Sequence, residues 1–410
     1  EELYQLTAWN PANYTVSLEG GGEVTVTDAA LSADKKTVTL TLGSDLAVGS
    51  TFNVTFTNLT GSTGVVMTGG NTGQFRTWDN TTDAIKVFIL AGQSNMVGHG
   101  KTEYGGNPDW TADNGEPKEI LGGLGSLRYL AVNDASYPDV DYAGLLVDPS
   151  QPATSAWNSR SDVKVWWKKG YVTETRSVLK GDLKIGYAES GSWFGPEYAF
   201  GRVMGDHFEK PVLIIKTSWG GIDLAQGFRP PTAVADRGGV VGPYYQAILA
   251  DLREVLGDLE GQFPAADHPE FAAVGYRYQI AGFGWHQGWN DGGSAAFANE
   301  YEANLADLID DLRAEFGQPT LPVAIANSGF GGVGGQTGNR LTVRQAQDSI
   351  GSLLTPHPVY SGTVLTGDTA PFWRDASQSP SSFGYHWNHN AETHYLIGKG
   401  MGEAMETLLP

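Results

Sequence analysis

From residue 84 onward, short apolar runs alternate with longer segments of helical periodicity, and this alternation restricts the fold more than any other feature. Strands that are apolar along their whole length are buried on both faces, as in parallel sheets covered by helices. The runs are IKVFIL, PVLIIKT, one within FAAVGYRYQIAGFGW, LPVAIANS and GTVLTG. The sequence therefore predicts an α/β domain over residues 84–410, built on a parallel sheet.

Three segments between and after these runs predict helices of that domain. Pro243 lies in the first turn of PYYQAILADLREVL, whose apolar residues recur on one face. EYEANLADLIDDLRAEFG repeats the pattern and stops at Gly317, and the chain ends in AETHYLIGKGMGEAMETLL. Residues 101 to about 185 lack this rhythm, so we expect a loop-rich insertion with a few short strands such as DVKVWW.

Residues 1–80 have a different pattern, in which apolar and polar residues alternate with a period of two. EVTVTDAALSADKKTVTLTL and STFNVTFTNLTG are rich in threonine and valine and are broken by polar turns. This pattern predicts antiparallel strands in a small sandwich, and the segment resembles the bacterial Ig-like modules that accompany secreted enzymes. GGNTGQFRTWDNTTD is the predicted linker to the α/β domain.

Composition excludes several classes of function. The formal net charge of -20 repels phosphate backbones and anionic membranes, so we expect neither nucleic acid nor membrane as a partner. The chain has no cysteine, which excludes disulfides, thiolate metal sites and a cysteine nucleophile. No apolar run approaches the roughly 20 residues that a membrane span needs. The sequence does not predict an oligomeric state.

Ser94 lies in AGQSNMVGHG, directly after the first apolar run and before a predicted helical turn. The carboxyl ends of parallel strands are where ligands bind in such sheets, so the Ser94 hydroxyl is a candidate nucleophile. The alternative is that Ser94 only caps the helix.

A serine nucleophile needs a general base, and three of the 8 histidines occur together in GYHWNHNAETHYLIG. His386 lies in a predicted loop before the last helix and is the candidate base. The spacings among His386, His389 and His394 match no standard zinc motif, so we expect no metal and interpret the other two as surface or packing residues.

Acyl transfer also requires hydrogen-bond donors for the oxyanion. Gly195 in SWFGPEYAFG precedes a helix that begins with proline, which leaves its backbone N–H available. Gln287 in GFGWHQGWNDGG follows a predicted strand and offers a side-chain amide. Each signal alone is weak, because glycine before proline is ordinary turn chemistry.

Five segments in this order together resemble the SGNH hydrolases, most of all the sialate O-acetylesterase-like branch that includes carbohydrate acetylesterases. They are GQSNM, FGPE, IIKTSWGG, WHQGWND and the terminal GYHWN. The resemblance covers residues 84 to 408 and implies a flavodoxin-like three-layer α/β/α sandwich that hydrolyses acetyl esters on sugars without a cofactor. It assigns Ser94 as the nucleophile, His386 as the base, and Gly195, Gln287 and the Ser94 N–H as oxyanion donors.

The third residue of the triad departs from the family pattern. Phe383 occupies the position of the usual aspartate three residues before the histidine, and Trp289 replaces a glutamate that some relatives have. Asp291 is the first candidate for the acid, with helix capping as its alternative, and the site otherwise works as a Ser-His dyad. Asp375, Asp368 and Glu392 are weaker candidates.

Half of the 12 tryptophans fall in or beside the motif segments. Indole faces match the apolar faces of sugar rings, so these residues are candidate substrate contacts, although some are expected in the core. They are Trp193, Trp219, Trp285, Trp289, Trp387 and Trp373. For Lys216 in IIKTSWGG we expect a structural role, and Arg344 is either a brace for the site or a surface cation.

The sequence thus predicts a secreted, periplasmic or cell-surface bacterial serine esterase that removes O-acetyl groups from a carbohydrate through an acetyl-enzyme on Ser94. The first alternative is a sialate O-acetylesterase. The second, motivated by the missing acid, is a carbohydrate-binding protein with a degenerate esterase site.

Overall fold

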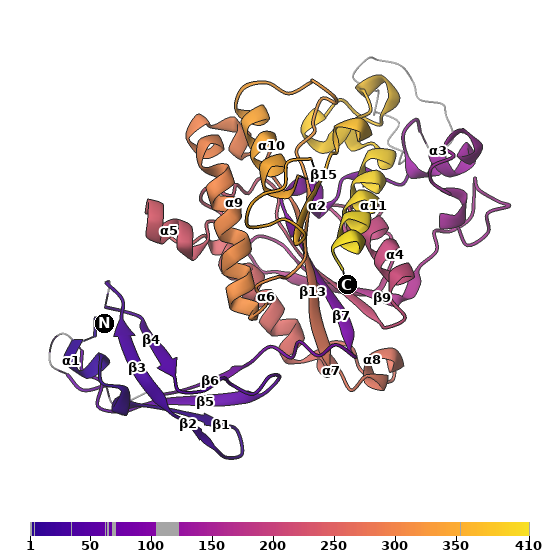
Figure 1. Ribbon diagram of the computed structural model, residues 1–410. Helices are drawn as coiled ribbons and strands as arrows, with labels where there is room; N and C mark the ends of the chain where they lie inside the picture. The colour runs from indigo at the N-terminus through magenta and orange to yellow at the C-terminus, as the bar shows by residue number, and fades with distance from the viewer. Residues whose placement is uncertain are drawn as a thin grey trace. The chain divides into compact units, whose positions relative to one another are not determined.

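The computed structural model describes residues 2–3, 5–33, 35–61, 63, 65–67, 71–103, 123–352 and 354–409. The chain divides into two compact units, Glu1–Thr82 and Asp83–Pro410 (Figure 1). None of the helices described in these ranges is long and apolar enough to cross a membrane.

The first unit consists of two small antiparallel sheets. The larger has the strand order β2-β1-β5-β6, from β1 (Tyr14–Leu18), β2 (Glu23–Val24), β5 (Thr51–Phe56) and β6 (Thr72–Arg76). The smaller pairs β3 (Val26–Leu31) with β4 (Val38–Leu42). Tyr14 of the first sheet and Ala29 of the second belong to one apolar cluster, so the two sheets share a core. The Ig-like assignment stays a prediction.

Part of the segment predicted as a linker is a strand. β6 pairs antiparallel with β5, and the Phe75 ring stacks on Phe52 with 5.7 Å between centroids. The cross-strand aromatic pair stabilises the pairing, and the connection between the units is correspondingly shorter than predicted.

The second unit is built on a seven-stranded sheet of order β10-β9-β12-β7-β13-β14-β15. All neighbouring pairs are parallel except β10 with β9. The strands are β7 (Ile85–Gly92), β9 (Arg160–Lys169), β10 (Ser177–Leu183), β12 (Val212–Ser218), β13 (Tyr278–His286), β14 (Val323–Ala326) and β15 (Val364–Gly367). The five predicted runs became β7, β12, β13, β14 and β15, which confirms the parallel sheet.

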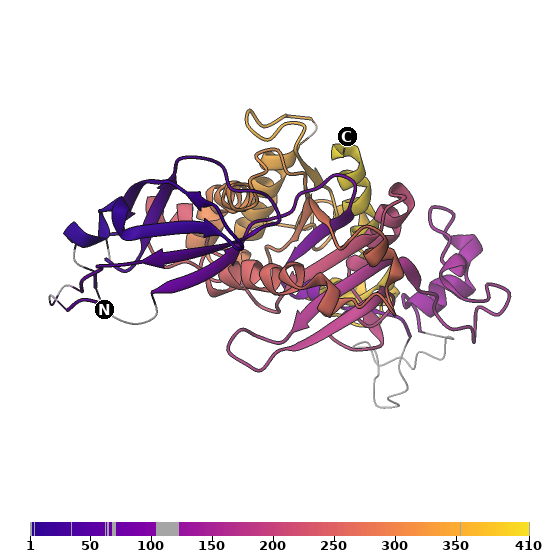
Figure 2. The ribbon, with the colours of Figure 1, turned by 90° about the horizontal axis from the view of Figure 1, so that it is seen from below.

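Helices cover both faces of this sheet, giving the predicted three layers (Figure 1). On one side α4 (Glu197–His207) packs against α11 (Ala391–Leu408), and residues of both helices share a core cluster with Phe88 and Leu90 of β7. On the other side lie α6 (Pro243–Gly257), α9 (Ala295–Phe316) and α10 (Gly338–Gly351). Figure 2 shows the same sheet between its helices from below.

Shorter elements complete the second unit. They include α2 (Ser94–Val97), β8 (Gly100–Lys101), α3 (Leu127–Val132), β11 (Trp193–Phe194), α5 (Pro231–Arg237), α7 (Leu259–Gln262), α8 (Pro269–Ala273), and the 3-10 turns η4 (Asp291–Gly293) and η7 (Gly384–His389).

The segment predicted as a loop-rich insertion contributes more to the sheet than expected. Residues 104–122 of it lie outside the described residues, but β9 joins β12 in parallel and β10 forms the edge. Val163, Val165 and Trp167 of β9 are buried in the core shared with α4 and α11. The predicted strand DVKVWW is therefore part of β9, which is longer than expected and belongs to the main sheet.

The sheet places three loops at one edge. In the register of the central strands, Gly92 of β7 is paired with both Ser218 of β12 and His286 of β13. The carboxyl ends of these three strands therefore meet, and the loops that follow them lie where ligands bind in open parallel sheets.

Candidate active site

Ser94 is the first residue of α2, immediately beyond the end of β7. The N-cap position belongs to Gln93, so Ser94 does not cap the helix. Ser94 is 8% exposed, and within the described ranges its hydroxyl has no hydrogen-bond partner. The hydroxyl is therefore held at a strand end without being used by the fold.

The side chain of Gln93 ties the Ser94 turn to the loop after β13. Its Oε1 accepts the backbone N–H groups of Gly288 at 3.1 Å and Asn290 at 3.3 Å, and its Nε2 donates to Asn290 Oδ1 at 3.3 Å. Since Gln93 is nearly fully buried, these bonds fix the position of Asn290 relative to Ser94.

The loop after β12 lies on the other side of Ser94. A Cβ atom built on Gly220 would lie 4.0 Å from Ser94 Cβ, so Gly220 leaves space beside the hydroxyl. Among the described residues the backbone N–H groups of Ser94 and Gly220 donate to no acceptor. Both N–H groups therefore remain available to a ligand.

Gly195 does not offer the free N–H group that the sequence predicted. Its N–H donates to Glu197 Oε1 at 3.0 Å, and Glu197 is completely buried. A Cβ atom on Gly98 would lie 2.6 Å from Gly195 Cα, so the two glycines allow a close backbone contact. Gly195 therefore has a structural role, because it allows two loops to pack closely against each other.

Gln287 also has a structural role in place of the predicted oxyanion contact. Its Nε2 donates to Asp291 Oδ2 at 2.6 Å and to the carbonyl of Ile222 at 3.1 Å, which uses both amide protons. Its Oε1 accepts the Tyr301 hydroxyl at 2.9 Å. A buried amide with every group paired has no donor left for a substrate.

Asn290, three residues later, is the side-chain amide that the sequence reasoning missed. It is half-buried, and its Nδ2 donates to the carbonyl of Gly221, next to Gly220. In the described part of the chain, the second Nδ2 proton has no acceptor. The WHQGWND motif contains both amides, and only their hydrogen bonds distinguish them.

Asp291 makes no hydrogen bond to His386 in the described part of the chain. Its carboxylate accepts the backbone N–H groups of Leu224 and Ala225 as well as Gln287 Nε2. Burial raises the pKa of Asp291 to about 6. The predicted alternative, capping of the following helix, is wrong because Ser294 is the N-cap of α9.

The three weaker candidate acids are paired elsewhere. Asp368 accepts Arg344 Nη2 at 2.8 Å, Asp375 accepts Trp373 Nε1 at 2.8 Å, and Glu392 forms a two-bond ion pair with Arg374. Arg344 forms ion pairs with Asp348 and Asp368, so its charge is used within the fold. Within the described ranges, no carboxylate is hydrogen-bonded to His386.

His386 lies in η7, which packs against α2. Asn95, next to Ser94, donates its Nδ2 to the carbonyl of Tyr385, next to His386, at 2.9 Å. The His386 ring stacks flat on His99, with 3.6 Å between centroids and 15° between planes. Burial lowers the pKa of His386 to about 4, so the ring is neutral at pH 7 and able to accept a proton.

The three residues after His386 have left-handed backbone conformations, with φ of 50° at Trp387, 55° at Asn388 and 57° at His389. Each such residue costs about 1–3 kcal/mol unless its surroundings hold it. Asn388 Nδ2 donates to Arg374 O at 2.9 Å, and Ser381 Oγ lies 2.8 Å from His389 Nδ1. Trp387 is fully buried, and these contacts together fix the turn that carries His386.

His389 and His394 are buried, in agreement with a packing role. His394 is in α11, with its Nε2 3.4 Å from the carbonyl of His386. Burial lowers the pKa of His389 to about 3 and lowers that of His394 strongly. His99, which belongs to the Ser94 segment, was not recognised as a site residue from the sequence.

The six candidate tryptophans separate into core and surface. Trp219, Trp285 and Trp387 are at most 2% exposed, so their prediction as substrate contacts was wrong. Trp193 and Trp289 are half-exposed, as is Trp373. Trp193 lies 5.7 Å from the His99 ring, and Trp289 lies 6.0 Å from Tyr385, so these two flank the segment of His386.

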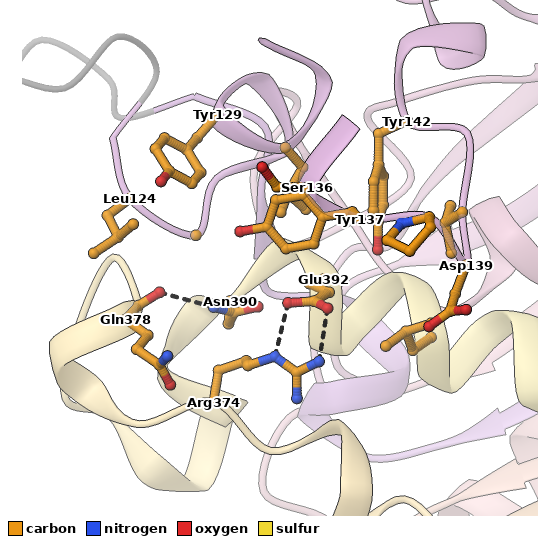
Figure 3. A pocket seen from close by; sticks show the side chains of 15 residues that line it. Leu124, Tyr129, Ser136, Tyr137, Asp139, Tyr142, Arg374, Gln378, Asn390 and Glu392 are labelled. Carbon is orange, nitrogen blue, oxygen red and sulfur yellow. Dashed lines mark hydrogen bonds and ion pairs between the residues drawn. The ribbon is translucent and has the colours of Figure 1, made fainter. Parts of the chain in front are cut away.

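A separate cavity of about 520 Å³ lies between the loops around α3 and the start of α11 (Figure 3). The Arg374–Glu392 ion pair lies on one side of it and the rings of Tyr129 and Tyr137 on the other. None of its lining residues is Ser94, His386 or Asn290. It is therefore distinct from the candidate active site.

The mostly parallel sheet between two layers of helices is an α/β fold consistent with the SGNH type. The family model described as "Carbohydrate esterase, sialic acid-specific acetylesterase" matches residues 152–361, about half of the chain. The chain belongs to this family. Ser94 and His386 lie outside the matched residues.

Solved structures similar to this chain share little sequence with it. A protein of Arabidopsis thaliana has 16% identity and a TM-score of 0.44, over 78% of this chain and 98% of that one. XAC1771, a carbohydrate acetylesterase from Xanthomonas citri, has 17% identity and a TM-score of 0.42, over 97% and 68%. NanS has 12% identity and a TM-score of 0.37, over 72% and 78%. No curated protein matches the chain.

Proposed function

We propose that this protein is a serine esterase that removes O-acetyl groups from a carbohydrate, with Ser94 as the nucleophile and His386 as the general base. The observation that carries the proposal is the Ser94 hydroxyl at the end of β7, which has no hydrogen-bond partner among the described residues and lies in a helix that packs against the His386 turn. Membership of a carbohydrate esterase family supports the same chemistry.

In the proposed reaction, His386 takes the Ser94 proton as Oγ attacks the acetyl carbonyl. The sugar hydroxyl leaves with that proton, and a water molecule activated by His386 then releases acetate from the acetyl-enzyme. Ser94 and His386 act as a dyad, because the four carboxylates considered as the acid are hydrogen-bonded to other groups. These are Asp291, Asp368, Asp375 and Glu392. The stack on His99 and the anchored turn after His386 hold the imidazole in place of an acid.

We assign the oxyanion to the backbone N–H groups of Ser94 and Gly220 and to Asn290 Nδ2. These three donors come from the loops after β7, β12 and β13, whose ends are in register. They replace Gly195 and Gln287, whose donors are used within the fold. Three donors of this kind stabilise the developing charge without having to reorganise.

Half-exposed Trp193 and Trp289 are the proposed contacts for the sugar ring. The net charge of -20 favours a neutral glycan, such as an acetylated polysaccharide or its oligosaccharides. Degradation of such a polymer takes place outside the cytoplasm, so we propose a secreted or periplasmic location.

A second substrate, O-acetylated sialic acid, is favoured by one observation. The Arg340 guanidinium lies 3.9 Å from the centre of the Trp289 ring and, among the described residues, has no carboxylate partner. An arginine of this kind is suited to a sugar carboxylate. The description of the matched family names sialic acid as well.

The test is hydrolysis of a small aryl acetate by the full chain and by Ser94→Ala. We expect activity that Ser94→Ala abolishes; an inactive protein that still binds glycan would instead be a carbohydrate-binding protein with a degenerate site. Acetate release from acetylated xylan-type oligosaccharides and from O-acetylated sialic acid then separates the two substrates. Arg340→Gln should weaken the reaction only with sialic acid.

A further inference from the structure

Three imidazole rings come together beside the proposed nucleophile. His99 comes from the segment between α2 and β8, whereas His386 and His389 both lie in η7. One ligand nitrogen from each ring can be chosen so that all three lie within 4.8 Å of one another. The ring centroids of His389 lie 5.5 Å from His99 and 5.6 Å from His386.

The nitrogens of this cluster are largely unused by the fold. His99 Nδ1 is buried, and within the described ranges it has no hydrogen-bond partner. Ser381 Oγ holds His389 Nδ1 at 2.8 Å, which orients the ring and leaves Nε2 for another contact. Metal-bound histidines are commonly oriented by such a bond on the other ring nitrogen.

His99 and His389 are buried, and His386 is half-buried. Neutral imidazole is the form that binds a metal ion. A lone pair buried without a donor costs free energy in the absence of a ligand, which a bound cation would recover.

We propose that His99, His386 and His389 bind one divalent transition-metal ion of the zinc class, and that this binding inhibits the esterase. The inhibition rests on the proposed function, because the ion occupies the imidazole that must accept the Ser94 proton. Three imidazoles without a thiolate or carboxylate suit zinc, cobalt, nickel or copper and do not suit magnesium or calcium.

The stacked rings make the two uses of His386 mutually exclusive. Ring nitrogens bind a metal in the plane of the ring, and the planes of His99 and His386 are 15° from parallel with 3.6 Å between centroids. One ring must therefore rotate about its Cβ–Cγ bond before both nitrogens face one ion. His386 is the least buried of the three, so it is the ring that turns.

The binding test uses cobalt chloride and the full chain and does not depend on activity. Cobalt(II) held by three imidazoles and water in a tetrahedral site gives visible absorption bands that the hexa-aqua ion lacks. We expect one equivalent to produce these bands and zinc chloride to remove them, whereas magnesium chloride leaves them unchanged. The absence of bands with cobalt overturns the proposal.

The inhibition test follows aryl acetate hydrolysis with increasing zinc chloride. At saturation we expect kcat to fall about 100-fold or more, the size of a general base's contribution, and to recover on addition of a chelator. Stimulation by zinc would overturn the inhibitory role and indicate a catalytic metal.

Variants locate the site. His99→Phe keeps an aromatic ring beside His386 but removes a ligand, and His389→Gln removes another. Each activity is divided by that variant's own metal-free value, and both should lose most of the zinc inhibition. His357→Gln, which changes a histidine stacked on Tyr360 and outside the cluster, is the control and should keep it. Equal inhibition of all three variants would contradict the proposal.

The two proposals fail in different ways. If no ester is hydrolysed, the cobalt bands still report whether the three histidines bind a metal. If the bands are absent while the esterase is active, the metal proposal alone is overturned.

Discussion

Lys216 Nζ lies 2.6 Å from Glu197 Oε2, and neither side chain has any exposed surface. Nζ also donates to the carbonyls of Val97 at 2.7 Å and Tyr187 at 2.5 Å, while the other Glu197 oxygen accepts the Gly195 N–H. This ion pair therefore joins the end of α2, the start of α4 and strand β12. It holds in place the backbone on which the Ser94 turn rests.

Removing one charge of this pair should destabilise the protein strongly. Burial lowers the pKa of Lys216 and raises that of Glu197, with each charge opposing the shift of the other. In Lys216→Met, Glu197 is left as an uncompensated buried charge, and the free energy of unfolding should fall by about 3–5 kcal/mol. The double variant Lys216→Met with Glu197→Gln should be more stable than Lys216→Met, as measured by denaturant unfolding. Additive losses would contradict this coupling.

The two amides of the WHQGWND segment should give opposite results. Asn290→Ala removes a proposed oxyanion donor from a half-buried position, so kcat should fall about 100- to 1000-fold with little change in stability. Gln287→Ala removes one hydrogen bond from each of Tyr301, Asp291 and the Ile222 carbonyl, which should lower the free energy of unfolding by about 0.5–1.5 kcal/mol for each bond. Kinetics with an aryl acetate and urea unfolding of both variants separate the roles. A large loss of kcat in a fully stable Gln287→Ala would favour the original assignment.

The half-exposed tryptophans should contribute more to binding of the sugar than to the chemical step. Trp193→Ala and Trp289→Ala each remove an aromatic face worth about 0.5–1.5 kcal/mol, so kcat/KM for an acetylated oligosaccharide should fall about 3- to 10-fold. The loss with an aryl acetate should be smaller. Equal losses with both substrates would mean that the rings only support the fold of the site.

The sequence was sufficient to predict the parallel sheet, because strands buried on both faces are apolar throughout and each central run in fact became a strand. β9 was underestimated because it lies in a segment without helical periodicity. Its place beside β12 depends on Val163, Val165 and Trp167 packing into a core that α4 and α11 complete from distant parts of the sequence. The periodicity of apolar residues along the sequence does not reveal such long-range contacts.

The sequence indicated where candidate site residues lie along the chain, but it did not indicate in which direction their side chains point. Ser94 and His386 were expected at loop edges, and the structure places their segments together. The motifs put Gln287 and Asn290 in one turn, but the sequence does not say which amide is turned into the fold. His99 was within the first segment considered, yet its partner ring is 287 residues away, and only tertiary packing brings them together.

Asp291 offers a test of whether an acid completes the triad. If Asp291 were the acid partner of His386, its replacement by asparagine would lower kcat about 10,000-fold with the fold intact. We expect the reverse for Asp291→Asn, a clear loss of stability with a smaller loss of kcat. The new amide would place its N–H groups against donors from Leu224 or Gln287. Thermal unfolding and aryl acetate kinetics on the same samples decide between the two.

The stability supplied by Asp291 should depend on pH in a defined direction. Burial raises its pKa from 3.8 to about 6 in the folded protein, so between these values the folded state binds a proton that the unfolded state has released. The contribution is therefore complete below about pH 4 and is lost as the pH rises through about 6. Asp291→Asn does not titrate, so the unfolding free energy of the unaltered protein minus that of the variant should fall by about 2–3 kcal/mol between pH 4 and pH 7. Urea unfolding at each pH measures this difference, with the exposed Asp236→Asn as the baseline. A difference that grows with pH would show that the hydrogen bonds to the carboxylate outweigh its burial.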